Sequence, residues 1–129
     1  MAEGMAEVIS KASLSTFIQT VKLDHLVWKV EIYRTIRNEN DKDEKDFADH
    51  HQCRLGKWYY QGEGQTQYKG FPEFHNLEQP HAKVHESGIA ALKAFKEDNG
   101  ELAVNKLAEM EAASVQVFEC LNALEAKVK

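Results

Sequence analysis

The sequence is poor in residues that interrupt helices, with only two prolines and seven glycines among its 129 residues. Most of them lie between residues 56 and 80. Glycine and proline are the strongest local breakers of regular structure. The two ends of the chain are therefore predicted to form long, uninterrupted helices, with the breaks confined to the middle.

Long hydrophobic runs are also missing. No apolar stretch approaches the roughly 20 residues that a membrane-spanning helix requires. The first residues, MAEGMAEVISKAS, lack the basic start and apolar stretch of a signal peptide. We therefore expect a cytoplasmic protein without membrane insertion. The formal net charge of −5 argues against a nucleic-acid partner, which would need clustered lysine and arginine.

The signatures of several other protein classes are absent as well. The sequence has only two cysteines, Cys53 and Cys120, and a reducing compartment would keep both as thiols. It contains neither a glycine-rich phosphate loop nor a Gly-x-Ser-x-Gly nucleophile turn, so an enzyme is not expected. Its length allows one hydrophobic core, and residues 1–129 are interpreted as a single domain.

Apolar residues recur at steps of four and three near both ends of the chain, the spacing typical of packed helices. The first helix is predicted over about residues 7–38 and the last over about 101–129. The first apolar stripe consists of Leu14, Ile18, Val21, His25, Trp28 and Ile32. The last stripe consists of Ala103, Leu107, Met110, Ser114, Val117, Leu121, Leu124 and Val128.

The middle of the chain is expected to contain two shorter helices between loops. Residues 38–49 hold six acidic residues and two lysines, so we expect a loop there. Asp49 is a candidate N-cap for a short helix over 50–61, which leads into a glycine-rich turn at 62–70. Pro80 fits the first turn of a third helix that ends near Asp98. The predicted fold is all-α, an antiparallel four-helix bundle whose second helix is short.

Three histidines are predicted to point toward the core of this bundle. His81 and His85 lie four residues apart, hence on one helix face, together with Leu77, Val84, Leu92 and Phe95. His25 lies on the first stripe. Burying imidazole nitrogens without partners costs about 1–3 kcal/mol each, and one metal ion would satisfy all three. Cys53 offers a fourth, anionic ligand, and this mixed nitrogen and sulfur set favours Zn²⁺ in the core.

Other interpretations of these residues remain open. A histidine on an apolar face is often a hydrogen-bonded core residue, and Cys53 could be a small buried apolar residue. His50 and His51 are expected at the surface, although a rotated second helix would make either a substitute ligand. A hemerythrin-like di-iron bundle also uses helical histidines, but it requires about five of them with bridging carboxylates. A purely structural, zinc-stabilised dimerisation module is the other alternative.

Three separated blocks of the sequence resemble the chemoreceptor zinc-binding domain family. They are LDHLVWK at residues 23–29, CRLGKWY at 53–59 and FHNLEQPHAKVH at 74–85. In that family a four-helix bundle holds zinc with three histidines and one cysteine. The corresponding residues here are His25, Cys53, His81 and His85, and Trp28, Gly56, Trp58 and Pro80 also fit the pattern.

The resemblance implies a regulatory domain of bacterial signalling, of the chemotaxis or cyclic-di-GMP type. Such a domain senses zinc, or oxidants through the reactive zinc-bound thiolate of Cys53. The resemblance also implies a homodimer and a fused or associated effector, a chemoreceptor or a diguanylate cyclase. Trp58 is expected to pack the short helix in place, Gly56 to permit close helix approach, and Trp28 to support the site by packing.

Overall fold

The computed structural model describes residues 2–128, and their side chains from residue 13 onward. All regular structure in this part of the chain is helical, which confirms the all-α prediction. The elements are α1 (Ala2–Ile36), the 3-10 helix η1 (Glu44–Asp46), α2 (Arg54–Tyr60), α3 (Glu63–Gln67), α4 (Pro72–His75), α5 (Glu78–Lys96) and α6 (Gly100–Val128). None of the helices in the described residues is long and apolar enough to cross a membrane.

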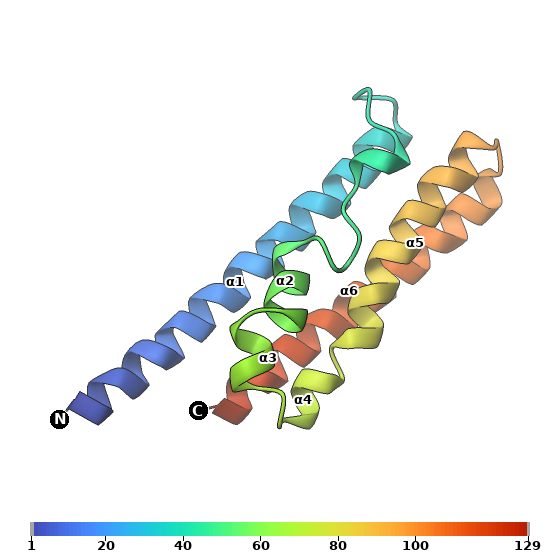
Figure 1. Ribbon diagram of the computed structural model, residues 1–129. Coiled ribbons are helices and arrows are strands. Elements are labelled where there is room, and N and C mark those ends of the chain that lie inside the picture. The colour runs from blue at the N-terminus through green and yellow to red at the C-terminus, as the bar shows by residue number, and fades with distance from the viewer. Residues whose placement is uncertain (1, 129) are drawn as a thin grey trace.

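The elements are arranged as a four-helix bundle in which one position is filled by short pieces. Figure 1 shows α1 and α5 running in the same direction and α6 returning beside α5. The chain segment with α2 and α3 descends between α1 and the other two long helices. The predicted bundle with a short second helix is thus confirmed, and α4 forms a single turn before α5.

The helices α1 and α5 end in the same way. Asn38 after α1 and Asp98 after α5 both have a φ of 59°, in the left-handed region. Asparagine and aspartate tolerate this conformation better than most residues, and it lets the last carbonyls find partners. The amide N–H of Glu39 donates to the Arg34 carbonyl oxygen and that of Asn99 to the Ala94 carbonyl oxygen. These caps end α1 and α5 at defined residues.

The start of the second helix differs from the prediction. The Asp49 carboxylate accepts hydrogen bonds from the backbone N–H groups of His51 (2.9 Å) and Gln52 (3.0 Å). Such side-chain bonds compete with helical bonding, so residues 50–52 form a turn and α2 begins only at Arg54, with Cys53 as its N-cap. The glycine-rich segment 62–70, expected as a turn, contains the short helix α3.

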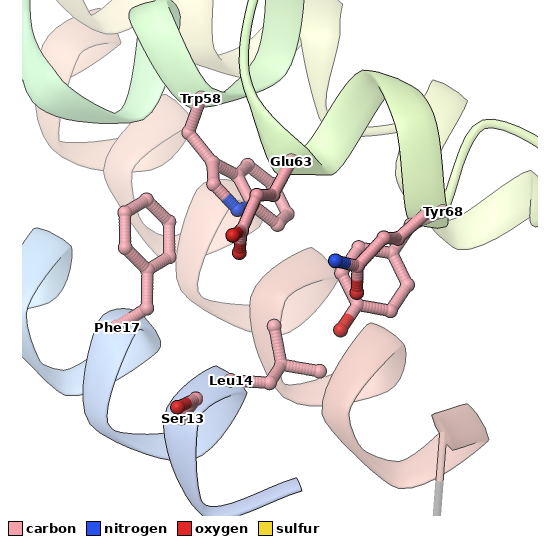
Figure 2. Close-up of a pocket in the computed structure, with 7 residues that line it drawn as sticks. Ser13, Leu14, Phe17, Trp58, Glu63 and Tyr68 are labelled. Atoms are coloured by element: carbon pink, nitrogen blue, oxygen red, sulfur yellow. The ribbon is translucent and has the colours of Figure 1, made fainter. Parts of the chain in front are cut away.

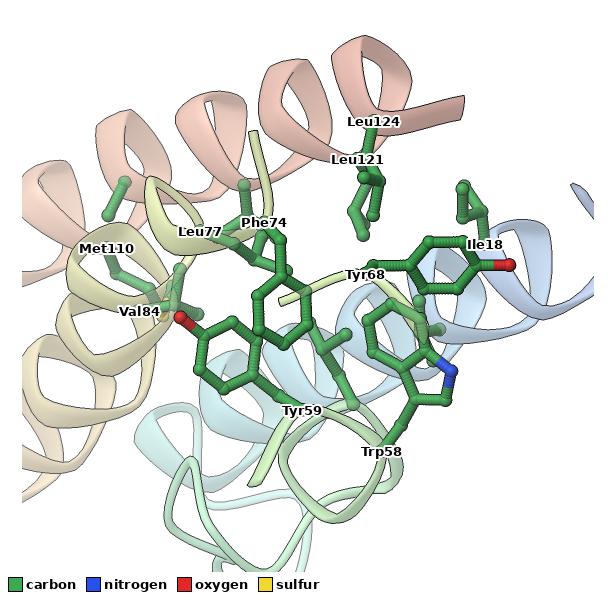
Figure 3. Close-up of a cluster of buried hydrophobic side chains, with 14 of the residues drawn as sticks. Ile18, Trp58, Tyr59, Tyr68, Phe74, Leu77, Val84, Met110, Leu121 and Leu124 are labelled. Carbon is green, nitrogen blue, oxygen red and sulfur yellow. The ribbon is translucent and has the colours of Figure 1, made fainter. Parts of the chain in front are cut away.

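The predicted apolar stripes form the core, shown in Figure 3. Most of their residues are buried, including Ile18, Val21 and Ile32 of α1 and Met110, Leu121 and Leu124 of α6. Tyr59 stacks on Phe74 with ring centroids 4.2 Å apart, which joins α2 to α4. Phe95 departs from the expected core face of α5: it lies in the last turn of the helix and is 39% exposed.

A partly buried polar contact joins α1 to α6 at the edge of this apolar core. The Lys29 ammonium, whose side chain is 13% exposed, donates to the Glu111 carboxylate (2.8 Å) and to the Ser114 hydroxyl (2.9 Å). The Tyr33 hydroxyl donates to the other Glu111 oxygen at 2.8 Å. Burial and this carboxylate raise the pKa of Tyr33 to about 12. The network fixes the register of α1 against α6, one turn from His25.

Candidate metal centre

Four side chains from three helices meet in the core, and their ligand atoms all lie within 4.8 Å of one another. They are His25 of α1, Cys53 at the N-cap of α2, and His81 and His85 of α5. The three histidines are 1–3% exposed. The structure therefore brings together the four residues that the sequence pattern singled out, from positions up to 60 residues apart.

Backbone carbonyls orient two of the three imidazoles. The Nδ1 atom of His25 lies 2.7 Å from the Val21 carbonyl oxygen, and that of His85 lies 2.8 Å from the Ala48 carbonyl oxygen. A carbonyl oxygen only accepts, so Nδ1 carries the proton in both rings and Nε2 keeps its lone pair. Both Nε2 atoms are buried without a hydrogen-bond partner. This is the arrangement that a metal-binding histidine usually has.

The unpartnered atoms face the remaining two side chains. The Cys53 sulfur lies 3.2 Å from the Nε2 atom of His81. Ring centroids are 5.1 Å apart for His25 and His81, 5.4 Å for His25 and His85, and 5.0 Å for His81 and His85. Zinc–nitrogen bonds of about 2.0 Å at tetrahedral angles place ligand imidazole centroids about 5 Å apart. The three rings thus fit a tetrahedral zinc ion.

Burial keeps the histidines neutral and ready to act as ligands. Desolvation, with smaller contributions from His25 and His85, lowers the pKa of His81 to about 2. Desolvation also lowers the pKa of His85 to about 4, although its bond to Ala48 opposes the shift. The pKa of His25 falls for the same reason. Protons therefore do not compete for these nitrogens at neutral pH.

The thiol of Cys53 behaves differently. In the protein without metal, burial raises its pKa, although backbone N–H groups of Gly56 and Leu55 oppose the shift. A zinc ion inverts this balance, because a coordinating thiol is deprotonated. The side chain is only partly buried. Of the four candidate ligands it is the one that solvent reaches.

Trp28 supports the site from the side of α1. Its ring centroid lies 4.5 Å from that of His85, and Phe47 packs against the indole edge-on with centroids 5.9 Å apart. A Cβ at Gly88 would lie 2.6 Å from the Trp28 ring, so only glycine admits the indole here. The resemblance pointed to Trp28, but Gly88 was missed because nothing in its local sequence marks the contact.

Gly56 and Trp58 position α2. A Cβ at Gly56 would overlap the carbonyl oxygen of His50. Glycine was expected here to permit the close approach of another helix. It instead makes room for the backbone of the turn at residues 50–52. Trp58 is buried and stacks on Phe17 of α1 with centroids 4.8 Å apart. Figure 2 shows Trp58 and Tyr68 beside a pocket of about 360 Å³ between α1, α2 and α3. The packing role of Trp58 follows from these contacts.

Three other side chains that could act as ligands or hold one lie outside the cluster. Asp24, next to His25, forms an ion pair with Arg54 (3.2 Å) and does not hold an imidazole, since carbonyls take that role. His75 is exposed and bonds to the Lys69 carbonyl oxygen. Cys120 is partly buried, and its thiol lies 3.6 Å from the Asn76 carbonyl oxygen.

The donor set also separates zinc from the di-iron alternative. The cluster found in the described residues contains three nitrogens and one sulfur and no carboxylate. Hemerythrin-like centres need bridging carboxylates, so the di-iron alternative lacks its ligands here. Four protein ligands leave no open position for a substrate on a tetrahedral ion, which is typical of non-catalytic zinc.

Comparison with known proteins agrees with this chemistry. Neither the curated proteins nor the solved structures contain a match to the chain. The family model described as chemoreceptor zinc-binding domain matches residues 25–92, more than half of the chain. The matched segment begins at His25 and includes Cys53, His81 and His85. The chain therefore belongs to the chemoreceptor zinc-binding domain family, and its cofactor is zinc.

Proposed function

We propose that His25, Cys53, His81 and His85 bind one zinc ion and that the domain regulates a bacterial signalling effector from the cytoplasm. The observation that carries the ligand assignment is the pair of buried, unpartnered Nε2 atoms on His25 and His85. Each faces a cluster completed by His81 and Cys53. Leaving such atoms unsatisfied would cost about 1–3 kcal/mol each, and zinc removes that cost.

Cys53 is the residue through which the domain responds to oxidants. Zinc keeps its sulfur as the thiolate, the form that oxidants attack. With a peroxide, the thiolate electron pair attacks one peroxide oxygen, the O–O bond breaks, and the products are a sulfenic acid and hydroxide. The sulfur is oxidised by two electrons and the peroxide is reduced. Sulfenic acid is a poorer zinc ligand than thiolate, so the bond between Cys53 and zinc weakens.

Loss of that bond changes how α2 is held. Cys53 is the N-cap residue of α2, and Arg54 pairs with Asp24 beside His25. An exposed ion pair contributes about 0–1 kcal/mol, which is too little to replace a zinc ligand. The start of α2 therefore loosens, and the change passes to the effector through α1 and α6. Variation in available zinc acts on the same ligand set.

An exposed apolar stripe on α1 supports a homodimer. Leu23, Leu26, Val27 and Val30 are 45–61% exposed and recur at helical spacing. They lie on the side of α1 opposite the buried stripe. Contiguous apolar surface on a helix usually marks an interface, and a second copy of α1 offers the same stripe. The sequence of α1 also contains Val8 and Ile9, whose side chains lie outside the described part of the chain.

The test is metal content by mass spectrometry on protein purified without added metal. Wild type should carry one zinc per chain, and Cys53→Ala and His81→Ala should carry less or bind it far more weakly. Cys120→Ala is the matched control, because it removes the other thiol outside the cluster. Zinc that is unaffected by either ligand substitution would show that the three histidines are ordinary core residues, and the proposal would fail.

The same protein tests the regulatory role against a structural one. Oxidation of Cys53 by one equivalent of peroxide should raise amide hydrogen exchange in α2 while α6 stays protected. A purely structural zinc site predicts unchanged exchange, or loss of the whole fold. Identical exchange and identical zinc coordination after complete oxidation of Cys53 would refute sensing through the thiolate.

A further inference from the structure

A fourth imidazole lies against the proposed zinc site without belonging to the four-residue cluster. The ring centroid of His50 is 5.7 Å from that of His81, with the two planes at 89°. The three clustered histidines are separated by 5.0–5.4 Å at angles of 73–86°. His50 thus approaches His81 at nearly the distance and angle of a ligand.

The backbone of this turn is fixed to the site on several sides. The carbonyl oxygen of Ala48 accepts from His85, and that of His50 lies 3.9 Å from the Cys53 sulfur and against Gly56. The Asp49 carboxylate holds the turn by two hydrogen bonds. Rotation of the His50 side chain alone, without refolding, therefore changes the distance of its ring from the cluster. His50 is partly exposed, and its ring also contacts those of His51 (4.2 Å between centroids) and Tyr60 (6.0 Å).

We propose that His50 is a reserve zinc ligand, which takes the place of Cys53 when the thiolate is oxidised and so retains the metal in a four-histidine site. This rests on the proposed function of Cys53. The oxidation consumes a peroxide as described above, and the exchange itself transfers no electrons. The neutral imidazole of His50 offers a nitrogen lone pair where the sulfur has lost its negative charge. Zinc accepts nitrogen as readily as sulfur.

The neighbouring His51 stacks closely on Tyr60 and provides a matched control. Its ring stacks on Tyr60 with centroids 4.3 Å apart, and the Tyr60 hydroxyl donates to the Glu78 carboxylate at 3.0 Å. This contact holds the His51 ring on Tyr60. Replacing His51 removes the same type of side chain from the same turn, together with its contact with the His50 ring, but keeps the imidazole of the reserve ligand.

The consequence is a switch that moves α2 without losing zinc. The three histidines of α1 and α5 stay bound, while Cys53 and the start of α2 are released. Two equivalents of a thiol then reduce the sulfenic acid: the first forms a mixed disulfide with Cys53 and releases water, and the second frees the Cys53 thiol and leaves with the first as a disulfide. The original ligand is restored without a need to acquire new zinc. A site without His50 would instead lose its metal with each oxidation.

Zinc K-edge X-ray absorption on the zinc-loaded full chain tests the exchange directly. Wild type, His50→Gln and His51→Gln are compared before and after one equivalent of hydrogen peroxide, and zinc release to a chromogenic chelator is timed. Before oxidation all three should show one sulfur near 2.3 Å and nitrogens near 2.0 Å, as a site with one thiolate requires. After oxidation wild type and His51→Gln should lose the sulfur and show four imidazoles.

Oxidised His50→Gln should show only three imidazoles. It should release zinc about tenfold faster than oxidised His51→Gln, or faster still, because loss of a group outside the ligand set already lowers zinc affinity by about that factor. Cys53→Ala provides an arm without oxidant: it should retain weak zinc binding that Cys53→Ala/His50→Gln loses. Equal release from oxidised His50→Gln and wild type would overturn the reserve-ligand proposal alone. Absence of a sulfur ligand before oxidation would instead refute the proposed role of Cys53.

Discussion

Substitution of Gly56 by alanine tests whether α2 and the zinc site are mechanically coupled. A Cβ here would overlap the carbonyl oxygen of His50, and it would lie 2.8 Å from the carbonyl carbon and 3.0 Å from that of His51. These are backbone atoms, so no side-chain rotation relieves the contact. Overpacking costs about 1–3 kcal/mol, and the backbone contact places the cost at the upper end. Alanine has a higher helix propensity than glycine, and this difference offsets about 1 kcal/mol of that cost.

The net expectation for Gly56→Ala is a loss of about 1–2 kcal/mol in the free energy of unfolding. Because the displaced turn carries Cys53, zinc affinity should fall as well. Urea unfolding with and without zinc measures both effects. Gly100→Ala is the control, since a Cβ there meets nothing within 4 Å. Equal stability and zinc affinity for Gly56→Ala and Gly100→Ala would refute the coupling.

Three further perturbations test other parts of the structure. Gly88→Ala places a Cβ 2.6 Å from the Trp28 ring, so we expect zinc to bind more weakly and the free energy of unfolding to fall by about 1–2 kcal/mol. Urea unfolding and chelator competition measure the two effects. Unchanged zinc affinity would show that the packing of Trp28 does not support the site. Removal of zinc should cost about 4 kcal/mol when free zinc was 1,000-fold above its dissociation constant, seen in thermal unfolding; an unchanged midpoint would contradict this. Leu26→Lys should shift sedimentation toward the monomer, whereas Val104→Lys, at an exposed residue of α6, should not; a persistent dimer in Leu26→Lys would exclude the α1 stripe.

The parts of the fold that the sequence predicts are those set by helix periodicity. Steps of four and three place residues on one side of a helix whatever the partner, so the α1 stripe and the position of His25 follow directly. His81 and His85 share a face for the same reason. Leu23 and Val27 do not fall on this stripe, and both are exposed.

The parts that the sequence does not predict depend on contacts between distant segments. The sequence predicted that Asp49 caps a helix beginning at residue 50. Its carboxylate instead closes a turn at residues 50–52, so the helix starts at Arg54. The bond between Ala48 and His85 spans 37 residues and involves a backbone carbonyl, which no side-chain pattern marks. The contact of Gly88 with Trp28 is of the same kind. The spacing of residues along one helix does not predict such contacts between distant segments.

The attachments of α2 suggest how loss of one ligand changes its position. Its first end is held by Cys53 and by the ion pair of Arg54 with Asp24, whose side chains are 59% and 35% exposed. Its other half is held by Trp58, buried against Phe17. A buried aromatic side chain contributes several times what an exposed ion pair does. Release of Cys53 should therefore let α2 pivot about Trp58 while the helix stays docked, so hydrogen exchange should rise at the Arg54 end before the Trp58 end.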